Sequence, residues 1–304
     1  MIIREGIVQL EDLRGSAVTV GKFDGLHLGH QKIIEEMVRY ARERSLCPVV
    51  LAISTPGAKR IFTREEMAAF LQDLGVELFI EIPFTEEFRN TDAESFLRRD
   101  LLGKLGMKAC LSGDDFRFGR GGAGDAAFLQ KEAEELGFEY HVIPDVSVDG
   151  EVVRSSLIRD KLAAMDVRSA REMLGRPYSL SGTVAHGRKL GSRIGYPTVN
   201  VVPAEDKFLP GFGVYAAELA VNEEDGSIWT CPGILDLGVK PTVQGDGSPA
   251  AEVHLFGFDG DLYGKRVTIS FLQDIRPEKK FGSLRELREQ IAKDVENVQQ
   301  LFKF

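Results

Sequence analysis

Short apolar runs alternate with helix-like segments over residues 17–144. The runs that we expect to be strands are AVTVG, VVLAI, LFIEI, KACLSG and YHVIP. Between the first two, apolar side chains recur every three or four positions, as on one buried face of a helix: Ile33, Ile34, Met37, Val38 and Ala41. Strands that alternate with helices in this way are typical of a parallel sheet covered by helices.

Further helices are indicated by residues suited to helix ends. Asp125 precedes AAFLQKEAEEL and Gly137 follows it, which predicts a capping carboxylate at one end and a left-handed residue at the other. A short helix is expected to begin near Ser155 or Ser156. The segment VRSAREML predicts one more helix, which ends at Gly175.

The pattern changes after Tyr178. The segments SLSGTVAHG, FGVYAAELAV, AAEVHLFGF and RVTISFLQDI are rich in β-forming residues and are separated by glycine- and proline-containing loops, which predicts an antiparallel barrel or sandwich. The tail returns to a helical pattern. Its apolar positions are Leu284, Leu287, Ile291, Val295, Val298 and either Leu301 or Phe302.

Length and charge narrow the class of protein. A chain of 304 residues exceeds the size at which one hydrophobic core usually stops growing, so two domains are expected. The chain has 38 basic and 47 acidic residues and a net charge of −9, which disfavours nucleic acid as a partner and favours small molecules.

Cysteine spacing and hydropathy predict where the protein works. Cys47, Cys110 and Cys231 form no C-x-x-C pair and leave an odd cysteine, which suits a reducing cytoplasm. No segment approaches the run of about 18 uncharged apolar residues that spans a bilayer, so we expect neither export nor membrane insertion.

The first candidate site is GKFDGLHLGH, residues 21–30, where the first strand turns into its helix. Open α/β sheets bind ligands at such positions. Gly21, Gly25 and Gly29 would let a phosphate approach the backbone, and the helix start offers N–H groups to an anion. His27 and His30 could donate hydrogen bonds to a nucleoside triphosphate, although such pairs also occur by chance. A metal site is less favoured, because no further histidine or cysteine cluster follows at ligand spacing.

The whole string resembles the G-x-F-D-G-x-H-x-G-H signature of the bacterial FAD synthetase module, a member of the H-x-G-H nucleotidyltransferase superfamily. The resemblance implies an ATP site that also includes Phe23 and Asp24, with His27 and His30 as catalytic residues.

Two later segments are similar to the same family. GDDFRFG, residues 113–119, looks like its G-x-D-F-x-F-G loop, which implies that Asp114, Asp115 and Phe116 bind flavin; a plain glycine-rich turn is the alternative. VRSSLIR, residues 153–159, is similar to its I-S-S-T-x-I-R run. This implies that Ser155, Ser156 and Arg159 hold the ATP phosphates; a helix cap with a solvated arginine is the alternative.

The chain departs from this family in two places. Arg154 stands where the family usually has serine. Residues 51–56 read LAISTP, whereas the family typically shows T-F-x-P-H-P, so a histidine is missing. Both departures bear on whether the adenylyltransferase half is active.

The second candidate site is HGRKLGSRIGYPTVN, residues 186–200, a basic loop followed by a proline-anchored turn. Gly187, Arg188 and Lys189 suit the phosphates of ATP, and oxygens of Thr198 and Asn200 suit hydrated Mg²⁺, which takes few protein ligands. A basic surface loop is the alternative. The string is similar to the riboflavin kinase signature that ends in P-T-A-N, with valine in place of alanine.

A catalytic base is indicated farther along. EVHLFGFDGDLYG, residues 252–264, looks almost unchanged from a riboflavin kinase segment, and this implies that Glu252 is the base. Strand alternation places Glu252 on the opposite face from Val253 and Leu255, where it could reach a hydroxyl. A surface glutamate is the alternative. Asp236 replaces an asparagine that is usual in a nearby segment of the family.

Together these features predict two domains. Residues 1–178 are expected to form an α/β Rossmann-like nucleotidyltransferase domain, and residues 179–304 an antiparallel β-barrel riboflavin kinase domain with a C-terminal helix. The resemblance implies phosphorylation of riboflavin to FMN and adenylylation of FMN to FAD, with ATP as co-substrate and Mg²⁺ as cofactor. A riboflavin kinase with a degenerate first domain and a non-catalytic flavin-binding protein remain as alternatives, and a homo-oligomer remains open.

Overall fold

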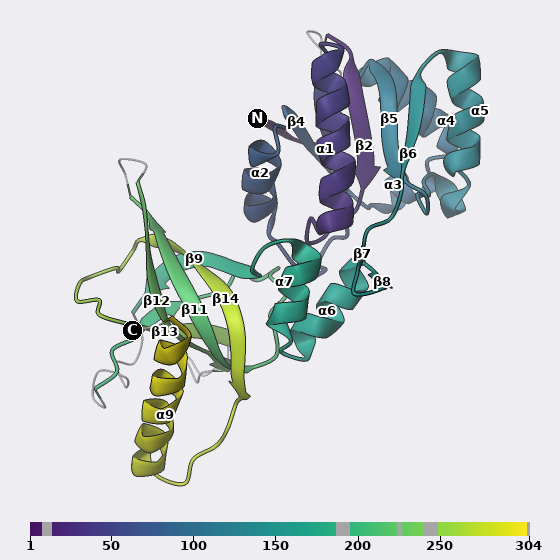
Figure 1. Cartoon of the computed structure of the whole chain (residues 1–304). Helices are drawn as coiled ribbons and strands as arrows, with labels where there is room; N and C mark the ends of the chain where they lie inside the picture. Colours follow the sequence, from purple (N-terminus) through teal and green to yellow (C-terminus); the bar gives the residue numbers. More distant parts are fainter. Residues whose placement is uncertain (8–13, 187–194, 224–226, 240–248, 303–304) are drawn as a thin grey trace. The chain divides into compact units, whose positions relative to one another are not determined.

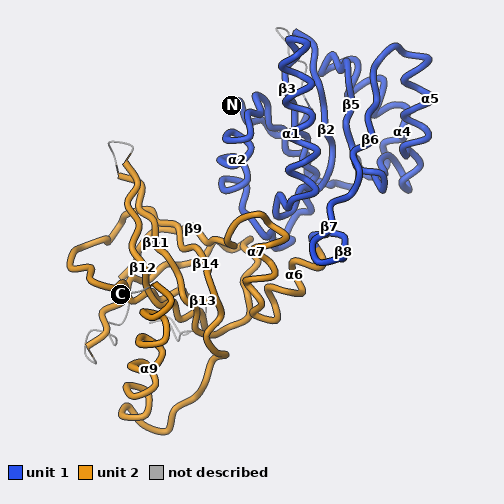
Figure 2. The backbone as a smooth tube through the Cα atoms, viewed as in Figure 1, with its two compact units in different colours: residues 1–155 blue, residues 156–304 orange. Residues whose placement is uncertain are grey.

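The computed structural model describes residues 1–7, 14–186, 195–223, 227–239 and 249–302. Its chain divides into two units, Met1–Ser155 and Ser156–Phe304, which are coloured separately in Figure 2. No helix within the described ranges is long and apolar enough to cross a membrane.

The first unit contains a parallel sheet with strand order β1-β4-β3-β2-β5-β6 (Figure 1). Its strands are β1 (Ile2–Glu5), β2 (Ser16–Gly21), β3 (Cys47–Ser54), β4 (Leu78–Pro83), β5 (Met107–Gly113) and β6 (Glu139–Ile143). The five strands expected from the sequence are confirmed. β1 was not expected, because an exposed edge strand of four residues carries no alternation of buried and exposed positions.

Helices follow the strands of this sheet. They are α1 (Leu28–Glu43), α2 (Arg64–Asp73), α3 (Glu86–Asn90), α4 (Ala93–Ser95), the π-helix η1 (Phe96–Lys104), the short 3₁₀ turn η2 (Arg120–Gly122) and α5 (Ala126–Leu136). Asp125 caps α5 through the amide of Phe128, and Gly137 ends it with φ +73°, as expected. A small hairpin, β7 (Ser147–Val148) with β8 (Glu151–Val152), closes the unit.

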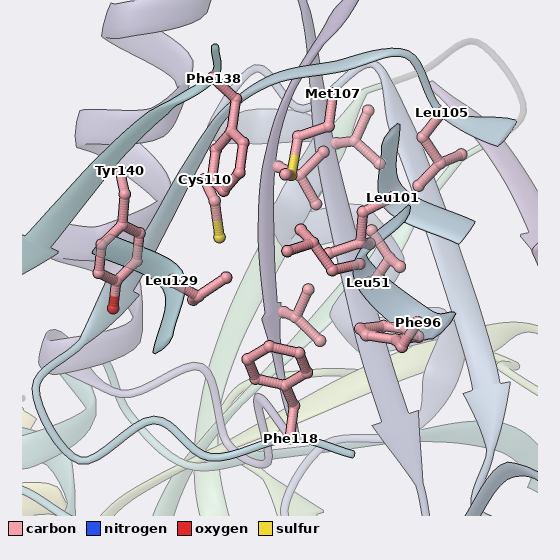
Figure 3. Packing of buried hydrophobic residues seen from close by; sticks show 14 of the residues in the cluster. Leu51, Phe96, Leu101, Leu105, Met107, Cys110, Phe118, Leu129, Phe138 and Tyr140 are labelled. Carbon is pink, nitrogen blue, oxygen red and sulfur yellow. The ribbon is translucent and has the colours of Figure 1, made fainter. Parts of the chain in front are cut away.

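Both faces of the sheet are buried. On one face α1 and α2 pack through residues such as Ile34, Met37 and Leu71. On the other face lies the cluster of Figure 3, to which η1 contributes Leu101 and α5 contributes Leu129. Because β2 lies between β3 and β5, the strand order reverses beside it, and the carboxyl ends of β2 and β5 border the crevice where such sheets bind ligands.

The second unit is built around a closed antiparallel barrel with strand order β10-β13-β12-β11-β14-β9. Its strands are β9 (Ser179–Ala185), β10 (Val199–Val201), β11 (Gly213–Asn222), β12 (Ile228–Val239), β13 (Pro249–Leu255) and β14 (Arg266–Pro277). The pairing of β9 with β10 closes the barrel and decides against a sandwich. Tyr215, Leu235 and Phe271 are fully buried in it.

Among the described residues, three helices accompany the barrel: α6 (Ser155–Ala163), α7 (Val167–Leu174) and the C-terminal α9 (Leu284–Phe302). α7 packs against β14, and the Gly211 amide bonds to the Leu162 carbonyl at 2.9 Å. Val298 of α9 packs on Val214, Ala216, Ile234 and Phe256. One position of the expected apolar stripe was wrong: Leu284 is 64% exposed, because the start of the helix extends past the apolar patch. Of the alternatives Leu301 and Phe302, it is Phe302 that packs against the patch, whereas Leu301 is 47% exposed.

Candidate functional sites

The first candidate site is the turn between β2 and α1. Its backbone is unusual, with positive φ at Phe23 (+48°), Gly25 (+82°) and Leu26 (+41°). A Cβ on Gly25 would lie 3.0 Å from the Ile61 side chain. Over Gly21 and Gly29 the space is taken by the rings of Phe23 and His27, within about 3.3 Å of where a Cβ would stand. Gly21 and Gly29 therefore make room for aromatic side chains, and Gly25 makes room for Ile61.

Asp24 fixes this turn from two sides. Its Oδ1 accepts a hydrogen bond from the Ile61 amide at 2.8 Å, and its carbonyl accepts one from the Ser155 hydroxyl at 2.8 Å. Thus Ser155 is brought to the turn from 131 positions away. The Asp24–Ile61 bond could not be predicted from the sequence, because it joins two loops that share no motif.

His27 is both the N-cap of α1 and a buried side chain. Its Nδ1 accepts a hydrogen bond from the His30 amide at 3.4 Å, and His27 as a whole is only 6% exposed. Burial lowers the pKa of His27 from 6.5 to about 4, so the ring is neutral at physiological pH. With Nδ1 assigned as the acceptor, Nε2 carries the proton and is the donor available to an anion.

His30 lies against His27, with ring centroids 3.6 Å apart and planes 20° from parallel. Burial, and then the neighbouring His27, lowers its pKa well below the usual 6.5. Its Nδ1 is buried and has no hydrogen-bond partner among the described residues. A buried polar atom of this kind is expected to meet a ligand or an ordered water.

The loop after β5 reaches the same edge of the sheet. Asp114 and Asp115 are exposed, and Phe116 stacks on Phe118 with ring centroids 5.4 Å apart. The Arg154 guanidinium lies 3.7 Å from the Asp115 carboxylate. Ser156 and Arg159 belong to the second unit, where the Arg159 guanidinium lies 4.7 Å from the Phe208 ring centroid.

The second candidate site lies on the barrel. Glu252 of β13 has two register partners, Asn200 of β10 and Asp236 of β12. Register partners project from the same face with Cβ atoms about 5 Å apart, so the three form one polar row. Val253 is fully buried and Leu255 nearly so, which confirms the expected alternation around the half-buried Glu252. The sequence marked Asp236 only as a residue that replaces the asparagine usual in the family. Its position beside Glu252 follows from the register of β12 and β13.

A separate cavity of about 170 Å³ is lined by residues of β9, β10 and β13 and by the segments that precede β10 and follow β13. Its lining residues are Val184, Pro197, Thr198, Val199, Leu255, Phe258, Asp259, Gly260, Asp261, Leu262 and Tyr263. The ring of His186 lies over that of Tyr263 at 3.9 Å, and His254 Nδ1 lies 2.8 Å from the Pro197 carbonyl oxygen. The walls thus combine apolar and aromatic groups with the Thr198 hydroxyl and two carboxylates.

Three predicted phosphate contacts, Gly187, Arg188 and Lys189, lie outside the described residues. Within the described ranges, no group of three or more histidine, cysteine or acidic side chains could hold a metal ion. The carboxylates Asp259 and Asp261 were not singled out from the sequence, although they follow directly on a predicted strand.

Known proteins share both halves of this chain. A family model described as FAD synthetase matches residues 9–157, and one described as riboflavin kinase matches residues 174–302. A protein of Pseudomonas fluorescens named bifunctional riboflavin kinase/FMN adenylyltransferase is 38% identical over 93% of this chain and 91% of its own length. The chain belongs to the bifunctional riboflavin kinase/FMN adenylyltransferase family.

Further relatives agree with this membership. The family member of Bacillus subtilis strain 168 is 32% identical over 93% of this chain and 92% of its own length. A solved structure described as a macrolide-efflux protein from Streptococcus pneumoniae superposes with a TM-score of 0.85 at 27% identity, covering 99% of each chain. The family architecture, an α/β domain followed by a barrel, therefore extends over the whole chain.

Proposed function

We propose that this chain transfers the γ-phosphoryl group of ATP to riboflavin and then transfers AMP from ATP to the FMN so formed, giving FAD. Consecutive matches to the two enzyme families carry the proposal. The row Asn200, Glu252 and Asp236 supports it, because a carboxylate predicted as a base stands beside a predicted metal ligand.

For the kinase step, Glu252 accepts the proton of the riboflavin 5′-hydroxyl as its oxygen attacks the γ-phosphorus. The bond from that phosphorus to the β-phosphate oxygen breaks, and ADP leaves. Gly187, Arg188 and Lys189 hold the phosphates. The cavity beside Thr198 suits the nucleoside end of ATP, because a flat base packs well on the Tyr263 ring and aliphatic walls.

Two residues at the start of β10, Thr198 just before the strand and Asn200 within it, fit Mg²⁺. Thr198 and Asn200 offer a hydroxyl and an amide oxygen two residues apart, and hard oxygen donors in small number are what Mg²⁺ accepts. When bound, the ion neutralises charge on the transferred phosphoryl group.

For the adenylyltransferase step, a phosphate oxygen of FMN attacks the α-phosphorus of ATP and pyrophosphate leaves. The turn of Gly21, Phe23, Asp24, Gly25 and Gly29 places the phosphates at the start of α1. Neutral His27 donates a hydrogen bond from Nε2 to the negative charge that develops on the phosphates during the reaction. The ring of His30 stabilises the same charge. Ser155, Ser156 and Arg159 hold the remaining phosphates, and Asp114, Asp115 and Phe116 contact the flavin.

We further propose a functional boundary near residue 178, since the riboflavin kinase match begins at residue 174. The barrel nevertheless packs with α7 inside one unit, so a separately expressed kinase domain would need that helix. The three cysteines are free and buried, in keeping with a cytoplasmic location. Whether the chain forms a homo-oligomer stays open, and light scattering would measure this.

One experiment tests the two activities separately. The purified chain is incubated with Mg-ATP and either riboflavin or FMN, and the flavins are separated by chromatography. We expect FMN and FAD from riboflavin, and FAD from FMN. If riboflavin gave FMN but no FAD formed, the adenylyltransferase site would be inactive. If neither FMN nor FAD formed, the result would support a non-catalytic flavin-binding protein.

A further inference from the structure

We propose that Arg154 binds the 5′-phosphate of FMN in the adenylyltransferase site and so determines how this site positions the attacking phosphate. The inference rests on the proposed function. It assigns a role to a side chain that stands where the family usually has serine.

The position of Arg154 is fixed by its neighbour. Ser155 donates from its hydroxyl to the Asp24 carbonyl at 2.8 Å, and Asp24 lies three residues before His27 in the same turn. The backbone of Arg154 is therefore held beside the H-x-G-H turn. From there the long side chain extends to the loop after β5, where its guanidinium lies 3.7 Å from Asp115.

The guanidinium is available to a ligand. The Arg154 side chain is 58% exposed, and Asp115 is its one ion-pair partner among the residues that the structure describes. At 3.7 Å, Nη1 of Arg154 is beyond hydrogen-bond distance from that carboxylate. The ion pair therefore orients the guanidinium and leaves its N–H donors available. An exposed pair of this kind contributes little stability and is readily exchanged for a phosphate.

Three carboxylates, those of Asp114, Asp115 and Asp145, make the surroundings of Arg154 acidic. Burial and the nearby Asp114 and Asp115 raise the pKa of Asp145, while Arg154 and Lys32 act in the opposite direction. A phosphate dianion entering here meets carboxylates that repel it. Of these two cations, Lys32 is already bonded through its ammonium to the Pro144 carbonyl at 3.1 Å, whereas the exposed Arg154 guanidinium can rotate toward the ligand.

The same geometry favours FMN over ATP as its ligand. The triphosphate of ATP is expected at the start of α1, where His27 is the cap. Arg154 instead faces the Asp114–Phe116 loop, which is the predicted flavin side. Adenylylation brings two anions together, and a planar guanidinium between them can hold the attacking phosphate through two hydrogen bonds.

The test measures FAD formation from FMN and ATP by the full-length Arg154→Ser variant, which restores the usual residue of the family. We expect the KM for FMN to rise about tenfold or more, the loss of one charge-assisted contact, while the KM for ATP changes less than about twofold. Arg154→Lys should give an intermediate KM, because lysine keeps the charge but not the fork.

Arg117→Ser is the matched control. Arg117 lies in the same loop as Asp115, is 64% exposed and pairs with one carboxylate, that of Asp125 at 3.3 Å, so it is an arginine of comparable exposure at another position. Its KM for FMN should equal that of the wild type. Riboflavin phosphorylation by each variant should also be unchanged, which checks that the rest of the chain is intact.

The outcomes separate the two hypotheses. If the wild type makes no FAD from FMN, the proposed adenylyltransferase function fails and the role of Arg154 fails with it. If the wild type makes FAD and Arg154→Ser leaves the KM for FMN unchanged, or raises the KM for ATP instead, the assignment to FMN is overturned alone.

Discussion

Asn200 on β10 and Glu252 on β13 are direct register partners, so their side chains project from the same face of the barrel. If Asn200 is the metal ligand and Glu252 the base, as proposed, these adjacent strands hold ATP and the riboflavin hydroxyl next to one another. Their relative position is set by backbone hydrogen bonds rather than by flexible loops. Mutations at this pair should therefore act on chemistry more than on folding.

Glu252→Gln should lower the rate of riboflavin phosphorylation at least about a hundredfold, because the amide cannot take the proton of the 5′-hydroxyl. Formation of FAD from FMN should continue at the wild-type rate. Chromatography of the flavin products measures both. Glu218→Gln, which removes a half-buried carboxylate from β11 of the same barrel, is the control and should change neither rate. Full kinase activity in Glu252→Gln would exclude this base.

His30→Ala should have the opposite effect. Loss of the ring should reduce the rate of FAD formation about a hundredfold to a thousandfold, the usual effect of removing one donor to a developing charge. Riboflavin phosphorylation should persist. His141→Ala on β6 changes a half-exposed histidine of the same sheet and serves as the control. If the two variants made FAD equally well, His30 would have no part in the reaction.

Both of these residues could be found from the sequence because each lies in a short, contiguous pattern. His27 and His30 share one strand-to-helix turn, and the period of two along residues 251–255 already places Glu252 outside the barrel. Local apolar patterns also predicted β2 to β6 of the sheet and the C-terminal helix.

Relationships between distant segments could not be predicted in this way. The bond from Asp24 to Ile61 joins two loops 37 residues apart, and Asp236 reaches Glu252 only through the pairing of β12 with β13. Closure of the barrel depends on β10, which has only three residues. Such features follow from the register and from packing between elements, which one sequence does not reveal.

Gly25→Ala should lower the free energy of unfolding of the first unit by about 2 kcal/mol or more. Alanine at φ +82° is strained, and its Cβ would also lie 3.0 Å from Ile61. Gly57→Ala separates the two effects, because Gly57 has φ +74° but nothing within 4 Å of an added Cβ. We expect it to lose only about 1 kcal/mol. Equal losses in calorimetry would show that contact with Ile61 is unimportant.

The stability of the first unit should fall as the pH falls from about 6.5 to about 4. The folded pKa of His27 is about 4, below its ordinary 6.5, so in this window the unfolded chain binds a proton that the folded chain does not. Between about pH 7 and about pH 5 this residue alone should reduce the free energy of unfolding by about 2 kcal/mol.

His27→Asn tests that assignment, because asparagine still caps a helix but does not titrate. Calorimetric unfolding across the same pH window should show a smaller loss for the variant than for the wild type. His30, whose pKa is also lowered by burial, would account for part of the loss that remains. An identical pH dependence in both proteins would contradict a buried, neutral His27.

The docking of α9 on the barrel should depend on a buried ion pair. The Asp294 carboxylate, 2% exposed, accepts from Arg276 Nε at 2.8 Å and from Gln290 at 2.8 Å. Arg276→Met would leave that carboxylate buried without its cation, which typically costs about 3–5 kcal/mol. Trp229, the single tryptophan, lies in β12, so its fluorescence during urea unfolding reports on this unit.

Arg285→Met is the control for this prediction. Arg285 lies on α9, as Asp294 does, but it is 88% exposed, so its loss should change the free energy of unfolding by less than about 0.5 kcal/mol. The double variant Arg276→Met with Asp294→Leu should recover most of the loss, because no charge is then left buried; if it were no more stable than Arg276→Met, lost packing of the arginine stem rather than the unpaired carboxylate would be the cause.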